Sequence, residues 1–104
     1  MGLKTTNYTT KSTNVFLDKA YALLRNLIIE KDGSARAIFA IQASRENAIE
    51  NEPLEKVEVH FQWDRKTDLA ATAYDAAKTQ KSIYNIDGED VVEYGSLYNW
   101  ENDY

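Results

Sequence analysis

The sequence predicts an α+β protein in which a small antiparallel β-sheet of three to four strands, a meander, packs against one Ala-rich helix. Three segments indicate this class: Val57–Trp63 alternates apolar and polar residues, Asp68–Gln80 is rich in alanine, and a turn over Lys31–Ser34 separates two apolar segments. A chain of 104 residues matches the common size of one domain. We expect a single α+β domain over residues 1–84 and an acidic C-terminal tail over residues 85–104.

The first fourteen residues are predicted to form an extended N-terminal arm. The segment Leu3–Asn14 is dominated by Thr, Asn and Lys. β-Branched Thr suits an edge strand or an extended arm and disfavours a core helix. Of these alternatives we favour the arm, residues 1–14.

The segment Leu17–Glu30 fits two periodicities. A helical stripe would contain Leu17, Ala20, Tyr21, Leu24, Leu27 and Ile28, whereas one strand face would contain Tyr21, Leu23, Leu27 and Ile29, interrupted only by Arg25. The next residues favour the strand, because Asp32-Gly33 is typical of a tight turn and Arg36–Gln42 alternates immediately after it. We therefore predict strand, turn and strand.

The second half of the domain is predicted to contain a strand and a helix. Residues 44–56 are polar and include the only proline, which indicates a connection. In Val57–Trp63 the apolar residues share one face, as in a strand with one wet face. The alanines of Asp68–Gln80 allow a helix to approach the sheet closely, and Lys78 near its end suits the helix dipole.

After the helix, the sequence predicts little further core structure. Residues 82–92 could form a short hairpin around Asp87-Gly88, although their charge weakens the signal. We expect little independent structure beyond Tyr94 and a core that is complete by Gln80.

No pattern for catalysis, a metal or a cofactor stands out. The chain has no cysteine, and the single histidine, His60, lies on the polar face of its strand, where a surface role is expected. The glutamates at 46, 50, 52, 55 and 58 lack the spacing of a calcium loop, and no glycine-rich phosphate loop is present. We expect no enzyme, no cofactor and no small-molecule substrate.

The charge of the chain lies in its last twenty residues. The net charge is −5, yet residues 1–84 contain 11 acidic and 12 basic side chains, so the deficit belongs to residues 85–104. This acidity argues against direct nucleic-acid binding, and no apolar run is long enough for a membrane span.

The acidic end also carries aromatic side chains, so it fits either a solvated tail or a docking segment. In a docking segment, carboxylates steer and aromatics anchor. The candidate partner-binding residues are Asp87, Glu89, Asp90, Glu93, Tyr94, Tyr98, Trp100, Glu101, Asp103 and Tyr104.

The order of these segments resembles small structural proteins of tailed bacteriophages, encoded among tail and baseplate genes. The resemblance rests on the Thr/Asn-rich start, the apolar segments Ala20–Leu24, Ala37–Ile41 and Val59–Trp63, and the segment Ala73–Thr79. It implies a sheet with one packed helix, no enzymatic activity, and a place in the host cytoplasm during assembly or in the virion. The acidic, aromatic extension departs from that family's shorter ending.

Two functions follow as expectations. The first is a non-enzymatic virion structural or assembly protein that contacts other protein subunits, including copies of itself; removal of Asn85–Tyr104 should then leave a folded monomer that no longer assembles. The alternative is a small acidic inhibitor that mimics nucleic acid as an anti-defence protein, which requires a rigid, continuous acidic surface. A generic protein-binding module is the broader form of the first.

Overall fold

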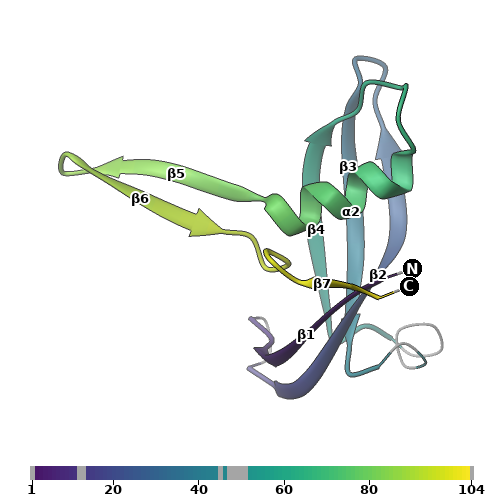
Figure 1. Cartoon of the computed structure of the whole chain (residues 1–104), viewed down its shortest axis with the longest axis vertical. Coiled ribbons are helices and arrows are strands. Elements are labelled where there is room, and N and C mark those ends of the chain that lie inside the picture. Colours follow the sequence, from purple (N-terminus) through teal and green to yellow (C-terminus); the bar gives the residue numbers. More distant parts are fainter. Residues whose placement is uncertain (1, 12–13, 45, 47–51, 104) are drawn as a thin grey trace.

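The chain folds into a five-stranded antiparallel sheet, a packed helix and a separate two-stranded hairpin (Figure 1). This computed structural model describes residues 2–11, 14–44, 46 and 52–103. The strands of the main sheet, in the spatial order β4-β3-β2-β1-β7, are β1 (Gly2–Thr9), β2 (Phe16–Ile29), β3 (Ser34–Gln42), β4 (Glu55–Gln62) and β7 (Glu101–Asp103). The other elements are α2 (Leu69–Thr79), β5 (Lys81–Ile86) and β6 (Glu89–Tyr94). The predicted α+β class is confirmed.

Strands β1 to β4 form a meander, because each pairs antiparallel with the next in the chain. The turn between β2 and β3 contains Gly33 at φ 90°, and Glu30 N–H donates to the Ser34 carbonyl at 2.9 Å. The prediction of strand, turn and strand for residues 17–42 is therefore confirmed.

A β-bulge at Arg25 changes which side of β2 faces the core. Leu24 pairs with Phe39, but the next paired residue is Asn26, opposite Ile38. The extra residue exchanges the two faces, so Ala22 before the bulge and Leu27 after it both belong to the core side. The expectation that Tyr21, Leu23, Leu27 and Ile29 share one face is wrong for this reason.

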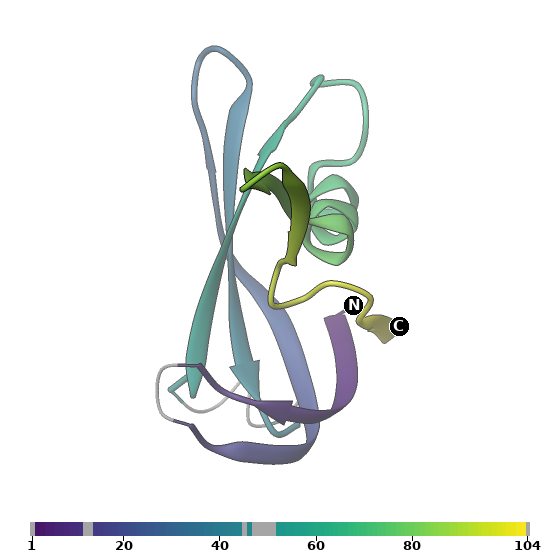
Figure 2. The ribbon, with the colours of Figure 1, turned by 90° about the vertical axis from the view of Figure 1, so that its left-hand side faces the viewer.

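Helix α2 covers one face of the sheet, as Figure 2 shows. The Asp68 carboxylate caps its first turn by accepting from Ala71 N–H at 2.8 Å. Ala73 and Ala77 are buried, and the Tyr74 ring meets Phe39 edge-on at 5.2 Å. Tyr74 Oη also accepts from Leu24 N–H at 3.1 Å, beside the bulge. The small alanine side chains thus let the helix pack close to the sheet, and Tyr74 connects the helix to β2 and β3.

The N-terminal segment is an internal strand and not a free arm. β1 pairs with β2 on one edge and with β7 on the other, and Leu3 is fully buried. The sequence of residues 1–14 alone does not separate a free arm from an internal strand. A Thr-rich strand can also lie inside a sheet when a distant segment supplies its second neighbour.

The C-terminal segment completes the core, which corrects two expectations. Leu97 and Trp100 are 1% and 6% exposed, and the Trp100 ring meets Tyr8 edge-on at 5.2 Å. Glu101 lies opposite Lys4 in the β1–β7 pairing and is exposed. The core is therefore not complete by Gln80, and there is ordered structure beyond Tyr94. The two apolar side chains are buried while their charged neighbour faces solvent.

We predict that Leu97→Ala lowers the free energy of unfolding by about 2–5 kcal/mol, because it removes a buried side chain and leaves a cavity. Removal of Asn85–Tyr104 should destabilise the fold still more, contrary to the expectation of a folded truncated chain. Urea unfolding followed by circular dichroism measures the loss. The control is Val15→Ala, at a side chain that is 40% exposed and outside the C-terminal segment, which should change stability by less than about 0.5 kcal/mol. Equal effects of both variants would contradict the core position of Leu97.

Candidate protein-docking site

The hairpin of β5 and β6, here called the arm (Lys81–Tyr94), projects from the body of the molecule (Figures 1 and 2). It forms a two-stranded sheet of its own, in which Lys81 pairs with Tyr94 and Ile86 with Glu89. Asp87 and Gly88 connect the strands at φ 52° and 84°, as a type I′ turn requires. The predicted hairpin around Asp87-Gly88 is confirmed.

Apolar side chains lie on both faces of the arm. Directly opposed residues share a face, so Ile83 and Val92 lie on one face and Tyr84 and Val91 on the other. The large apolar residues of the arm are 41% to 62% exposed: Ile83, Tyr84, Ile86, Val91, Val92 and Tyr94. A group of this kind typically marks an interaction surface, and a lone two-stranded hairpin is only marginally stable in water. The arm is the strongest candidate site.

The base of the arm is fixed to the folded body at both strands. β5 follows directly from α2, and Gly95 N–H donates to the Gln80 carbonyl at 2.9 Å. Asn99 N–H donates to the Lys78 carbonyl at 3.0 Å, and the Tyr94 and Tyr98 rings lie 4.3 Å apart. The position of the arm is therefore set by the helix and by the segment that buries Leu97 and Trp100.

Tyr8 connects β1 to β4 close to this base. Its hydroxyl donates to Glu55 Oε2, and Lys11 N–H donates to the other oxygen of the same carboxylate at 2.8 Å. Burial raises the pKa of the Tyr8 hydroxyl, and the hydrogen bond to Glu55 raises it further. With its ring against Trp100, Tyr8 links the start of the sheet to the end of the chain.

The structure divides the predicted partner-binding residues into separate groups. Those on the arm are Asp87, Glu89, Asp90, Glu93 and Tyr94. Of the others, Tyr98 is half-buried at the base of the arm, Trp100 is buried, Glu101 is exposed on β7, Asp103 belongs to β7, and Tyr104 lies outside the described residues. Buried Trp100 cannot act as an exposed anchor in this fold.

Sequence reasoning missed the apolar residues of the arm. Ile83, Tyr84, Ile86, Val91 and Val92 were not candidates, although they are β-branched or aromatic and flank an Asp-Gly turn. Those features together are a strong hairpin signal, which the charge of the segment obscured.

The acidic residues of the arm do not form one surface. Asp90 lies on the face of Ile83 and Val92, whereas Glu89 and Glu93 lie on the opposite face. A nucleic-acid mimic needs phosphate-like charges on one side, so this division lends the mimic reading little support.

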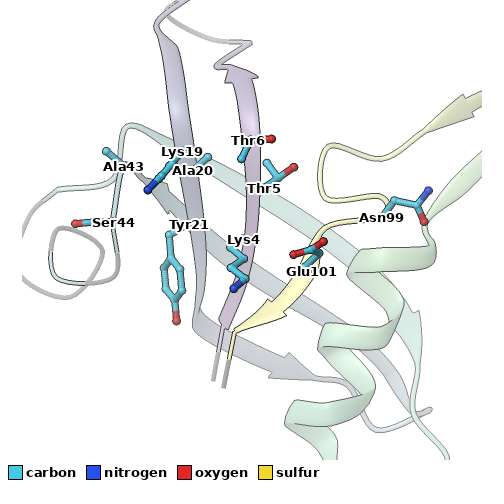
Figure 3. Close-up of a pocket in the computed structure, with 10 residues that line it drawn as sticks. All are labelled: Lys4, Thr5, Thr6, Lys19, Ala20, Tyr21, Ala43, Ser44, Asn99 and Glu101. Carbon is cyan, nitrogen blue, oxygen red and sulfur yellow. The ribbon is translucent and has the colours of Figure 1, made fainter.

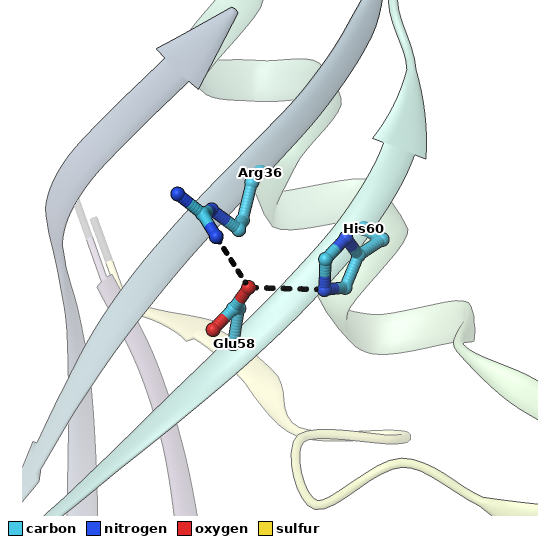
Figure 4. A network of polar contacts seen from close by, with 3 residues as sticks. All are labelled: Arg36, Glu58 and His60. Atoms are coloured by element: carbon cyan, nitrogen blue, oxygen red, sulfur yellow. Dashed lines mark ion pairs between the residues drawn. The ribbon is translucent and has the colours of Figure 1, made fainter.

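The other polar features are a shallow groove and a surface network. The groove, about 530 Å³, is lined by residues of β1, β2 and β7 and of the segment after β3, with Lys4 opposed by Tyr21 and Glu101 (Figure 3). On the far side of the sheet from α2, Glu58 Oε1 lies 3.3 Å from an Arg36 nitrogen and 3.0 Å from His60 Nε2 (Figure 4). All three side chains of this network are 43% exposed or more, which is typical of a solvated surface pair and its neighbour.

Within the described ranges, no three or more His, Cys, Asp or Glu side chains gather in a way that could hold a metal ion. In the same ranges, no helix is long and apolar enough to cross a membrane.

Comparison with known proteins adds no relative. The chain matches no protein-family model, no curated protein and no solved structure. The arm and its surroundings are therefore the features of the chain that bear on its function.

We predict that the free energy of unfolding falls as the pH rises above about 10, the ordinary pKa of tyrosine. The folded chain holds the Tyr8 proton more tightly than the unfolded chain, so deprotonation favours unfolding above that pH and has no effect below it. Urea unfolding from pH 8 to pH 12 measures the dependence, and Tyr8→Phe should reduce its slope. Tyr74→Phe is an independent check, because burial also raises the pKa of Tyr74. An unchanged slope in both variants would contradict the linkage.

Proposed function

We propose that the chain is a non-enzymatic structural or assembly protein that works through protein–protein contacts, with the arm as its main docking element. One observation carries the proposal: six large apolar side chains are exposed on a hairpin that projects from the body. An isolated monomer gains little from such an element, since the apolar area stays in water. A complex that covers it gains about 25 cal/mol for each Å² removed from water.

The chemistry of the arm suits a protein partner. Tyr84 and Tyr94 combine apolar area with a polar end, the type of residue that anchors many interfaces. The carboxylates at the turn and along β6 give the arm an acidic border, which favours approach to basic surfaces and disfavours acidic ones. An apolar contact area with charged residues around it is typical of a specific interface.

The wider setting is proposed from the resemblance to phage tail and baseplate proteins. In that setting the chain is a virion subunit or an assembly factor, made in the host cytoplasm and incorporated through the arm. The absence of enzymatic activity is part of the same proposal. His60 supports it, because its neighbours Glu58 and Arg36 lie on an open sheet face with no nucleophile among the residues of the network.

We predict that replacing residues 83–92 by a two-residue Asn-Gly turn abolishes association but leaves the body folded. Ser82 and Glu93 face each other in the hairpin, so the shortened strands can still close at the base. Circular dichroism and thermal unfolding test the fold. Sedimentation velocity tests self-association, and immobilised full-length and shortened chains test the retention of other proteins.

The matched control is Ile38→Ala, a half-buried apolar residue on the sheet face away from α2, which should leave association unchanged. If the shortened chain is folded and associates as well as the full chain in both assays, the proposal is wrong.

A further inference from the structure

We propose that the partner of the arm is the arm of a second copy, joined along the outer edge of β5 to give a four-stranded sheet with two-fold symmetry. This inference rests on the proposed function and specifies its partner. An open strand edge matters for such a contact, because it offers unpaired backbone groups to any strand that can reach it.

Charged residues lie along three of the four outermost strands in the described structure. The outermost strands are β4 and β7 in the main sheet and β5 and β6 in the arm. β4 carries Glu55, Lys56 and Glu58, β7 carries Glu101, and β6 carries Glu89, Asp90 and Glu93. Charges on an edge strand discourage pairing with other chains.

β5 differs from the other three strands. Its sequence, Lys-Ser-Ile-Tyr-Asn-Ile, contains one charge, Lys81, at the end next to the body, and neither proline nor glycine. Its three large apolar residues are among the most exposed of the chain, from 48% for Tyr84 to 62% for Ile83. Of these four strands, β5 is therefore the best suited to accept another strand.

The charges of β5 also fit a second copy of itself. An antiparallel β5–β5 pair centred on Tyr84 places Tyr84 opposite Tyr84 and Lys81 of each copy opposite Asp87 of the other. The two lysines lie at opposite ends of the new pair, and the acidic β6 strands lie on the outside. By contrast, a β6–β6 pair centred on Val91 would place Glu89 opposite Glu93, and like charges in this position are destabilising.

The projection of the arm would place the bodies of the two copies at opposite ends of the proposed pair. The arm extends beyond the body in Figure 1, so an antiparallel second arm can lie alongside it with its own body beyond the turn. Pairing would convert two marginal two-stranded hairpins into one four-stranded sheet, which is large enough to be stable. A two-fold contact of this type is closed and gives a dimer, not a filament.

The first experiment places charges at the centre of the proposed pair in the full-length chain. Tyr84→Asp and Tyr84→Lys should each weaken dimer formation at least about tenfold, because identical charges meet across the two-fold axis. Mixing the two variants in equal amounts should restore a dimer, since opposite charges then meet. The matched control is Val91→Asp, at the residue opposite Tyr84 on β6, which should change dimer affinity by less than about threefold. Sedimentation equilibrium measures the dissociation constants.

The second experiment uses the absence of cysteine from the chain. A single Tyr84→Cys variant should form an intermolecular disulfide under mild oxidation, because directly opposed residues in a strand pair lie close to disulfide distance. Val91→Cys, one strand further from the axis, should cross-link much more slowly. Equal cross-linking of the two variants would overturn the β5–β5 pairing.

The remaining outcomes separate this inference from the proposed function. A full-length chain that stays monomeric at every concentration, or that grows without limit, overturns the two-fold dimer. If that monomer still retains other proteins that the shortened chain loses, the arm docks to a different partner and the proposed function stands. If the full chain and the shortened chain dimerise equally, the β5–β5 pairing is wrong, and if they also retain other proteins equally, the proposed function is wrong as well.

Discussion

The fold depends on the burial of Leu97 and Trp100 beside the first strand. This contact holds β7 against β1, so the two ends of the described chain lie together at one side of the sheet. Burying a side chain such as leucine contributes about 1.5–3 kcal/mol, which is a large share of the net stability of a domain this small. The same segment also fixes the base of the arm, because the N–H groups of Gly95 and Asn99 donate to carbonyls at the end of α2. A contact that stabilises the core therefore also positions the candidate docking element.

This coupling has a consequence for binding. A hairpin on a flexible linker loses much freedom when it docks, and that loss reduces affinity. Here β5 begins at the end of the helix and β6 ends at the Tyr94–Tyr98 ring contact, so part of the ordering cost is met when the chain folds. The folded body thereby presents the arm in a defined direction, which a two-fold contact requires.

The sequence predicts those parts of the fold that local patterns determine. Alternation in β4, the Ala-rich helix α2 and the turn at Gly33 each depend on a few neighbouring residues, and each is found as expected. The bulge at Arg25 and the pairing of β1 with β7 depend on distant partners, which no single segment reveals. For the site, averaging charge over residues 85–104 identified an unusual region but combined two environments: buried Leu97 and Trp100, and the exposed arm. The apolar residues of the arm were missed because acidic neighbours lowered the apparent hydrophobicity of a segment rich in β-branched and aromatic residues.

The acidic residues of the arm then have a different role from the one that their composition first indicates. Asp90 lies on one face of β6 and Glu93 on the other, so a carboxylate borders the outer edge of that strand on both faces. In the proposed dimer only β5 pairs, and an arm that pairs through one edge joins one other arm. On this proposal the carboxylates limit association to a closed pair and keep an otherwise apolar hairpin from adding further strands. Charge determines where the contact stops, and the β-branched and aromatic residues of β5 determine where it forms.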